Sequence, residues 1–291
     1  MKKVIVVTGA SSGLGLSLAI KLAKQGNCVY ATMRDLAKRD AVLKAADESG
    51  VKLIVKELDV EDTSSVNACI AAIMAEEGRI DCLVNNAGMG FIKSTEQASE
   101  EEIQRILNTN FMGVVRCVKA VLPHMRQARS GHIINISSVG GLVGQPFNEI
   151  YCASKFALEG YTESMATYIQ PAFNIKFSLI EPGGITSEFA NNIYARLGSK
   201  RETEDEYDPI LNQYLAGARS RANNADGRSV YQSPDEVAEC IVDVIYSKNP
   251  PLRIRSSDWA NSFCQLKTQA DPDGSQLTNA VRSLFFERDM S

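Results

Sequence analysis

The sequence of 291 residues predicts a doubly wound α/β fold built around a parallel sheet. Short apolar segments rich in β-branched residues alternate with longer segments of helical periodicity. Most of the short segments are apolar on both faces, as expected for strands that helices cover on both sides. A cluster of glycines also joins the first strand segment to the first helical segment. Together these observations predict a sheet with helices on both of its faces.

Seven segments are predicted to form strands because each is short, apolar and bounded by turn-forming residues. The strands are expected at Val4–Thr8, Cys28–Met33, Lys52–Glu57, Cys82–Asn85, His132–Ser137, Lys176–Glu181 and Leu252–Arg255. The segments between them repeat apolar residues at helical spacing. The helices are expected at Leu14–Gln25, Ala37–Glu48, Thr63–Glu77, Glu100–Met125, Tyr151–Ile169 and Pro234–Tyr246.

The alternation breaks once, over residues 185–233. A polar stretch of mixed charge from Gly198 to Pro209 is followed there by a short helical pattern at Ile210–Ala218. We expect a substrate lid rather than a second domain, because long loops at the edge of a sheet commonly carry function. The chain 1–291 is then one domain. Its last helical pattern presents an apolar face for docking on the body or on another subunit, made of Leu277, Val281, Leu284 and Phe285.

The composition excludes several classes of function. The 31 basic and 35 acidic residues give a formal net charge of −4, whereas a nucleic-acid binder normally carries a basic excess. The seven cysteines form no CxxC pair, so we expect buried free thiols, and with two histidines we expect no metal site. No apolar run approaches the roughly 20 residues of a membrane span, and the first apolar stretch ends at Val7, too early for a signal peptide. We therefore expect a cytoplasmic protein with no nucleic-acid partner.

The glycine cluster lies between the first strand and the first helix and predicts a dinucleotide site of the Rossmann type. Gly9 permits a sharp turn out of the strand, Gly13 permits close approach of a pyrophosphate, and Gly15 lets the helix lie close to the sheet. The free N–H groups at the start of that helix face the phosphate charge. The candidate cofactor-binding residues of this loop are Gly9, Ser11, Ser12, Gly13, Leu14 and Gly15.

The end of the second strand predicts which cofactor is bound. A carboxylate there grips a ribose 2′-hydroxyl, but the expected position is the uncharged Met33. Arg34 follows and can pair with a 2′-phosphate, although Asp35 can still reach a hydroxyl. We therefore favour NADP(H) over NAD(H).

Turns after the third and fourth strands supply further candidate cofactor contacts. Asp59 and Val60 follow the third strand, where a carboxylate can accept a hydrogen bond from the adenine amino group. After the fourth strand a polar turn is expected beside the adenine ribose, made of Asn86, Ala87 and Gly88.

The fifth strand and the helix after it carry the candidate catalytic residues. Ser138 ends the strand, Tyr151 follows thirteen residues later, and Lys155 lies one helical turn further on the same face. A tyrosine pKa near 10 must fall by about three units, roughly 4 kcal/mol, for the phenol to act as a base at neutral pH. A positive charge about 4 Å away supplies approximately that at an effective dielectric of about 20.

These residue types match proton transfer to or from a carbonyl oxygen. Tyr151 exchanges the proton, Ser138 hydrogen-bonds the substrate oxygen, and Lys155 lowers the tyrosine pKa and binds the nicotinamide ribose. Asn110, on the helix before the fifth strand, is expected to hold a water that relays protons to Lys155. The cofactor performs the redox chemistry, so no metal is needed.

These motifs, in this order, resemble the short-chain dehydrogenase/reductase family. The resemblance covers about residues 3–190 and implies the strand order 3-2-1-4-5-6-7. It also implies that Asn110, Ser138, Tyr151 and Lys155 form the family's catalytic tetrad, and that Thr186 contacts the nicotinamide carboxamide. The other cofactor-binding residues implied near the sixth strand are Pro182, Gly183 and Ile185.

Within the family, the stretch from Ser138 to Gly160 looks most like the branch of 17β-hydroxysteroid dehydrogenase type 1 and the photoreceptor retinol dehydrogenases. In that branch the residues at Ser12 and Arg34 favour NADP(H). The steroid enzyme carries a cap histidine that grips the steroid, whereas the corresponding segment from Tyr214 to Ser220 has none.

The sequence therefore predicts an NADP(H)-dependent oxidoreductase for an apolar ketone or aldehyde and its alcohol, with a steroid-, retinoid- or lipid-like substrate. A 3-oxoacyl carrier-protein reductase is an alternative, although such chains usually end soon after the seventh strand. A non-catalytic dinucleotide sensor or scaffold is another, although such proteins often lose the tyrosine or the lysine. The family resemblance also implies a homodimer or homotetramer.

Overall fold

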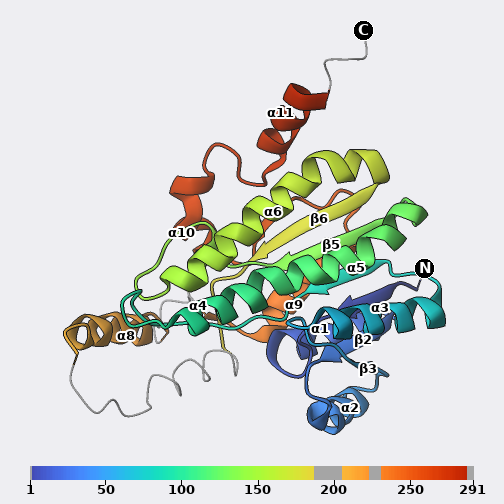
Figure 1. Cartoon of the computed structure of the whole chain (residues 1–291), viewed down its shortest axis with the longest axis horizontal. Coiled ribbons are helices and arrows are strands. Elements are labelled where there is room, and N and C mark those ends of the chain that lie inside the picture. Colours follow the sequence, from blue (N-terminus) through green and yellow to red (C-terminus); the bar gives the residue numbers. More distant parts are fainter. Residues whose placement is uncertain (1, 187–204, 223–230, 287–291) are drawn as a thin grey trace.

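The computed structural model describes residues 2–186, 205–222 and 231–286. Within these residues, seven parallel strands form the main sheet in the order β3-β2-β1-β4-β5-β6-β9 (Figure 1). This order confirms the predicted doubly wound topology, with β9 in the seventh place. The strands are β1 Val4–Val7, β2 Cys28–Met33, β3 Ile54–Glu57, β4 Cys82–Asn85, β5 Gly131–Ile136, β6 Ile175–Glu181 and β9 Arg253–Arg255.

Helices cover both faces of the sheet, and side chains alternate between the faces along each strand. In β1, Val4 and Val6 pack on one face, and Ile5 and Val7 pack on the other. The first face is covered by α3 Thr63–Glu77, α5 Gly113–Ala128 and α6 Glu149–Phe173. The second is covered by α1 Gly13–Lys24, α2 Arg39–Glu48 and α9 Pro234–Tyr246. The apolar character of both strand faces thus follows from burial on both sides.

The helix predicted at Glu100–Met125 is not continuous. The chain forms α4 Glu100–Leu107, then the π-helical segment η2 Asn108–Met112, and then α5. Within η2 the side chains of Thr109 and Asn110 are buried. Their partners explain the wider turn, because both reach across to Met89 in the loop after β4. Such π segments recur at functional sites.

Several short elements were not predicted from the sequence. The 3₁₀ turns η1 Leu36–Lys38 and η3 Val139–Gly141 follow β2 and β5. The strands β7 Gly184–Ile185 and β8 Tyr231–Gln232 pair with each other in a separate parallel ladder. Helix α10 Asp258–Thr268 follows β9. These elements matter for the site because most of them border the cleft described below.

The region predicted as a lid contains α8 Asp208–Ala222, which includes the predicted helical pattern. Residues 187–204 and 223–230 of that region lie outside the described residues. The C-terminal helix α11 Ser275–Phe286 packs beside α6 at the edge of the molecule (Figure 1). Leu277 and Phe285 of its apolar face are exposed, Phe285 by 70%, so these two positions do not dock on the body, and their predicted contact with another subunit stays a prediction.

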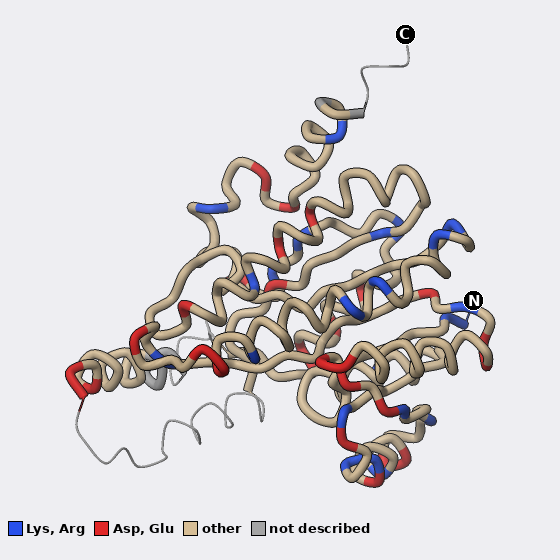
Figure 2. Tube along the Cα trace, in the orientation of Figure 1, with Lys and Arg blue, Asp and Glu red and all other residues tan. Residues whose placement is uncertain are grey.

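The cysteines are mostly buried, and the charged residues are spread along the chain. All seven cysteines are free, and six of them are buried, as predicted. Acidic and basic residues are interspersed along the chain (Figure 2). Among the described helices, none combines the length and the apolar character that crossing a membrane requires.

Candidate active site

A cleft with a volume of about 1020 Å³ opens at the carboxyl ends of the parallel strands. Its wall is made by the loops that follow β1 to β6, with further residues from α8 and α10. Ligands of doubly wound sheets bind at this edge, where loops diverge on either side of the strand-order reversal. The volume is at the upper end of the usual range of roughly 300–1000 Å³ for small-molecule sites.

The glycine loop after β1 is held against the turn after β4. Gly9 has a φ of +65°, and a Cβ there would lie 2.8 Å from the Cα of Ala87. A Cβ on Gly15 would lie 2.5 Å from both the Gly9 carbonyl oxygen and the Asn86 side-chain nitrogen. Asn86 in turn donates from Nδ2 to the carbonyl oxygens of Thr8 at 2.9 Å and Gly9 at 3.1 Å. Only glycine fits these two positions.

This arrangement fits a dinucleotide phosphate. The N-cap residue of α1, Ser12, makes no side-chain capping bond to the first turn, and the loop Gly9–Gly15 lines the cleft. The first N–H groups of a helix have no partner within the helix, and they attract negative charge. A phosphate at the start of α1 therefore finds donors there, with no side chain in the way at Gly13.

The end of β2 presents positive charge to the cleft. The Arg34 side chain is 59% exposed, and its Nη1 lies 3.9 Å from the Glu61 carboxylate. The neighbouring Asp35 is occupied locally, because its carboxylate accepts a hydrogen bond from Ala37 N at 2.9 Å and caps η1. Lys38 also lines the cleft. Arg34 and Lys38 therefore bring positive charge to the cleft, and the Asp35 side chain caps η1.

The residues after β3 are held by two different contacts. The Asp59 carboxylate accepts a hydrogen bond from Glu61 N at 3.0 Å, and its own N–H donates to Ser65. Val60 is buried, and its side chain approaches Gly113 so closely that a Cβ there would lie 2.8 Å away. The start of α5 therefore supports this part of the wall.

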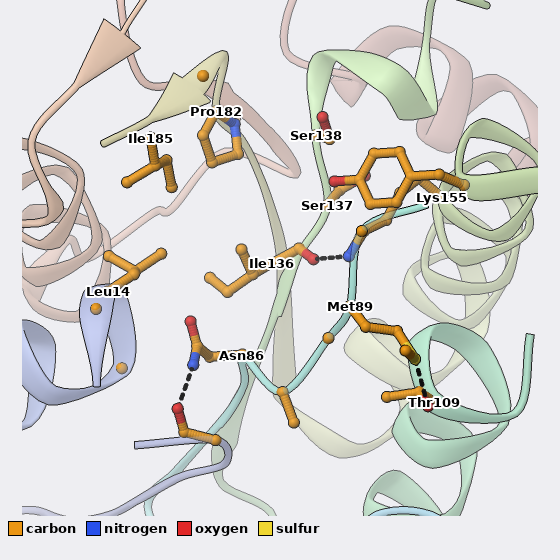
Figure 3. A pocket seen from close by; sticks show the side chains of 18 of the residues that line it. Leu14, Asn86, Met89, Thr109, Ile136, Ser137, Ser138, Lys155, Pro182 and Ile185 are labelled. Carbon is orange, nitrogen blue, oxygen red and sulfur yellow. Dashed lines mark hydrogen bonds between the residues drawn. The ribbon is translucent and has the colours of Figure 1, made fainter. Parts of the chain in front are cut away.

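Ser138, Tyr151 and Lys155 meet on the wall between β5 and α6. Ser138 accepts a hydrogen bond from Gly140 N at 3.0 Å, and its hydroxyl is hydrogen-bonded to the Tyr151 phenol. The Lys155 ammonium donates to the carbonyl of Ile136 at 2.8 Å (Figure 3) and lies 5.8 Å from the centre of the Tyr151 ring. The predicted helical spacing thus brings the phenol and the ammonium to the same side of α6.

Burial dominates the protonation of both groups. It raises the pKa of Tyr151 to about 12, against the opposing effect of the Ser138 hydrogen bond. It lowers the pKa of Lys155 to about 8, against the opposing charge of Glu159. Lys155 is not among the groups that shift the Tyr151 pKa here, so the expected lowering of that pKa by Lys155 stays a prediction. The ammonium is directed to the Ile136 carbonyl and lies 5.8 Å from the centre of the Tyr151 ring.

Asn110 lies behind the wall rather than on it. Its side chain exchanges two hydrogen bonds with the Met89 backbone, at 2.8 and 2.9 Å, and donates to Ser154 at 3.1 Å. A Cβ on Gly88 would lie 3.4 Å from the Asn110 oxygen and 3.8 Å from the Lys155 nitrogen. Asn110 therefore braces the loop after β4, and its side-chain oxygen and the Lys155 ammonium both lie close to Gly88.

The structure brings the predicted cofactor-binding residues to the cleft with one exception. Thr186 is not part of the wall, and its hydroxyl donates to the carbonyl of Gln232 at 3.2 Å. The wall residues Pro182, Gly183 and Ile185 precede it directly. The ladder between β7 and β8 accounts for this orientation, because Thr186 continues the pairing with its backbone N–H at 2.9 Å.

The sequence analysis missed the apolar end of the cleft. Trp259 and Phe263 of α10 stack with ring centres 4.8 Å apart and line it. Their spacing of one helical turn was a signal, but nothing in the sequence placed α10 beside the site. The other cleft residues that were not predicted are Met89, Ile92, Val143 and Gln145, whereas Tyr214 and Leu215 fall within the predicted lid.

Comparisons with known proteins agree with this geometry. A family model described as short chain dehydrogenase matches residues 3–198. Retinol dehydrogenase 8 of Homo sapiens is 42% identical over 288 residues, which cover 98% of this chain and 90% of that protein. The 17-beta-hydroxysteroid dehydrogenase type 1 of Homo sapiens is 37% identical over 295 residues, which cover 98% and 86%. Both belong to the branch that the sequence resembles.

A solved structure of an actinorhodin polyketide ketoreductase with NADPH is similar as well. It is 31% identical, with a TM-score of 0.72, and the match covers 84% of this chain and 90% of that one. The glycine cradle, the parallel sheet and these relatives all agree on one class of chemistry. The chain belongs to the short-chain dehydrogenase/reductase family and is an oxidoreductase that acts on CH–OH groups with a nicotinamide nucleotide.

Proposed function

We propose that this oxidoreductase uses NADP(H) and interconverts an apolar ketone or aldehyde with its alcohol. The observation that carries the proposal is one cleft in which the Ser138–Tyr151 pair lies between a glycine cradle and an aromatic wall. The cradle fits a dinucleotide, the wall fits an apolar substrate, and the hydroxyl pair lies where the two meet.

The catalytic roles follow from the protonation states. A phenol with a pKa of about 12 is neutral at pH 7, so Tyr151 is ready to donate its proton to a carbonyl oxygen. Ser138 hydrogen-bonds the same oxygen and stabilises the charge that develops on it. The bound nicotinamide nucleotide supplies the hydride. Lys155, with a pKa near 8, is mostly charged at pH 7 and favours the release of the tyrosine proton.

The two remaining site residues, Asn110 and Thr186, are proposed to position the cofactor. Asn110 holds the loop of Met89 and Gly88 at the position where a nicotinamide ribose reaches Lys155. We keep the predicted contact of Thr186 with the carboxamide, which requires its hydroxyl to leave the Gln232 carbonyl.

The preference for NADP(H) rests on charge at the end of β2. Arg34 and Lys38 face the cleft, and Asp35 is committed to capping η1. A 2′-phosphate gains charge-assisted hydrogen bonds from an exposed arginine, whereas one oxygen of the Asp35 carboxylate already accepts the Ala37 N–H. The ketoreductase relative was solved with NADPH.

The apolar end of the cleft supports a lipophilic substrate. Trp259 and Phe263 present stacked aromatic rings, and Val143 and Leu215 add aliphatic surface. The names of the relatives describe a retinol and a hydroxysteroid as substrates. We infer that this chain acts on a retinoid-, steroid- or lipid-like molecule. We also infer that the predicted lid at residues 185–233 belongs to the same single domain.

We also infer a homodimer or homotetramer. Helix α6 leaves Phe156 and Tyr168 exposed, and Met112 in η2 is exposed too. Apolar surface of this kind on adjoining elements is typical of subunit contacts. Light scattering at micromolar concentration tests this inference, and a monomer alone would contradict it.

The experiment for the proposed function compares Tyr151→Phe with the unaltered enzyme on a panel of retinoid, steroid and long-chain carbonyl compounds with NADPH. Loss of the proton donor is expected to lower kcat by roughly 10²- to 10⁴-fold. Binding of NADPH, measured by fluorescence, changes little. Equal turnover by the two proteins would defeat the role of Tyr151.

The matched control is Tyr161→Phe on the same helix. Tyr161 packs edge-on against Phe111, with ring centres 5.7 Å apart, and is not part of the cleft wall. This control is expected to retain activity. A wild-type enzyme that turns over none of the panel would contradict the proposed substrate class.

A further inference from the structure

One cluster of buried polar atoms lies behind the catalytic wall and is not explained by packing. Among the described residues, six buried side-chain nitrogen and oxygen atoms lack a partner with good hydrogen-bond geometry, although those of the cluster contact one another. Five of the six belong to this cluster, on Ser137, Glu159, Glu181 and Arg253, with both oxygens of Glu159 included. Buried polar groups normally find partners, so such a concentration calls for a physical reason.

The cluster joins α6, β6 and β9. Glu181 ends β6 and is 0% exposed, and Glu159 on α6 is buried as well. Arg253 Nε lies 3.5 Å from a Glu159 oxygen and 4.0 Å from a Glu181 oxygen. Arg255 Nη1 donates to Glu181 at 3.0 Å. Two carboxyl groups therefore face one guanidinium in the interior.

Two buried carboxyl groups of the cluster, Glu159 and Glu181, face each other, and this contact favours one additional proton. Glu163 pairs with Arg253 as well, so three carboxyl groups share two guanidinium groups. Against these two guanidinium groups, three carboxylates carry one excess negative charge, which acts on the Lys155 ammonium along α6. A carboxylate is an acceptor only, so two facing carboxylates cannot satisfy each other unless one carries a proton. Burial raises the pKa of both Glu159 and Glu181, which favours that proton.

The same cluster reaches the catalytic residues through α6. Tyr151, Lys155 and Glu159 follow one another at intervals of four residues and so lie along one side of the helix. The charge of Glu159 raises the pKa of Lys155 against burial. Gly141 of η3 packs directly against Ser137 and Glu159, because a Cβ there would lie 2.7 Å from Ser137 Oγ and 3.1 Å from Glu159 Oε1. No larger residue fits between the cleft wall and the cluster.

We propose that the Glu159–Glu181 pair stores one proton behind the active site and that its negative charge keeps the Lys155 ammonium protonated. Glu159 is thus a positioning residue that acts through Lys155, and this inference rests on the proposed role of Lys155. As the pH rises, the pair ionises, and the added negative charge holds the proton on Lys155. Proton loss from the catalytic lysine is thereby delayed to higher pH.

The groups that face the pair come from every element packed on it. They include Lys155 and Glu163 on α6, Arg253 and Arg255 on β9, Cys264 on α10 and Asp273 in the loop before α11. The two arginines are permanently charged at the pH values concerned. Burial raises the pKa of Cys264 to about 12. Glu181, whose pKa burial raises to about 8, and Lys155, whose pKa burial lowers to about 8, are therefore the groups expected to titrate near neutral pH.

The test compares Glu159→Gln with Glu163→Gln, a matched control one helical turn away that contacts the same arginine at the edge of the cluster. Removal of the Glu159 charge is expected to move the alkaline limb of kcat/KM by about one pH unit to lower pH, a loss of about tenfold on that limb. Glu163→Gln is expected to leave the limb in place. An unmoved limb in folded Glu159→Gln, or the same shift in both variants, would overturn the proposal.

A second measurement does not depend on activity. A carboxyl group with a raised pKa stabilises the folded state at low pH, and this stability is lost as the pH rises toward 8. The thermal midpoint of the wild type is therefore expected to fall between about pH 4.5 and 8, and Glu159→Gln and Glu181→Gln are expected to flatten that fall. A flat wild-type profile would show that no proton is stored. If the wild type reduces no carbonyl, the proposed function fails, while this profile still tests the pair.

Discussion

The nucleotide end and the apolar end of the cleft are built in different ways. The nucleotide end is mostly backbone and small side chains from the loops directly after β1 and β4, and it is held by hydrogen bonds from Asn86. The apolar end consists of large side chains from η3, α8 and α10, which are more than a hundred residues apart from first to last. One end is defined by close steric approach and the other by apolar surface.

This difference indicates which end of the cleft tolerates substitution. A glycine in steric contact with backbone has no room for a methyl group, since the opposing atoms belong to the main chain. An aromatic wall can change its side chains and keep a cavity, because apolar contacts have no fixed direction. We therefore expect the nucleotide end to fail abruptly and the apolar end to change in a graded way.

The largest effect is expected for Gly15→Ala. The new Cβ would lie 2.5 Å from the Gly9 carbonyl oxygen and 2.9 Å from the Ala10 Cα, so the loop must move. We expect loss of measurable NADPH binding by calorimetry and a destabilisation of about 1–3 kcal/mol. In the control Gly160→Ala, the added Cβ meets nothing within 4 Å, so stability is expected to hold or to rise by about 1 kcal/mol. Normal NADPH binding by Gly15→Ala would contradict the expected difference between the nucleotide end and the apolar end.

The second effect concerns the choice of cofactor. Arg34→Ala removes a charge-assisted donor and is expected to weaken NADPH binding by about 10- to 100-fold, while NADH binding changes little. Arg39→Ala, five residues on in α2 and outside the cleft wall, serves as the control. Titration of both nucleotides by fluorescence gives the ratio. Equal losses for both nucleotides would mean that Arg34 does not recognise the 2′-phosphate.

The smallest effect is expected at the apolar end. Trp259→Ala removes one of the two stacked rings and is expected to raise the KM for an apolar carbonyl substrate by about tenfold, with NADPH binding unchanged. Leu266→Ala is the control on the same helix, where Leu266 is 95% exposed. Steady-state kinetics separate the two ends of the cleft. A change in NADPH affinity with constant KM would show that the two ends are not independent.

Much of the nucleotide end was predictable because its signals are local. Gly9 and Gly15 adjoin a strand of apolar residues, and the spacing of Tyr151 and Lys155 requires only a helix to bring them to one side. The strands were predicted to within two residues at each end, since burial on both faces leaves a plain apolar signature. The helix predicted at Glu100–Met125 is present, but its π-helical turn η2 was not predicted, because the side-chain contacts of η2 with Met89 are not visible in the spacing of apolar residues.

The sequence by itself determined the family, the order of the elements and the residues of the glycine loop, because each depends on short-range periodicity and sterics. The packing of distant elements fixed which residues lie around the glycine loop and behind the catalytic residues. It brought α10 to the cleft, moved Asn110 behind the wall, and buried Glu159 and Glu181 against two arginines from β9. Burial then raised the pKa of Tyr151, which no spacing could indicate, since desolvation depends on what every other element packs around a group.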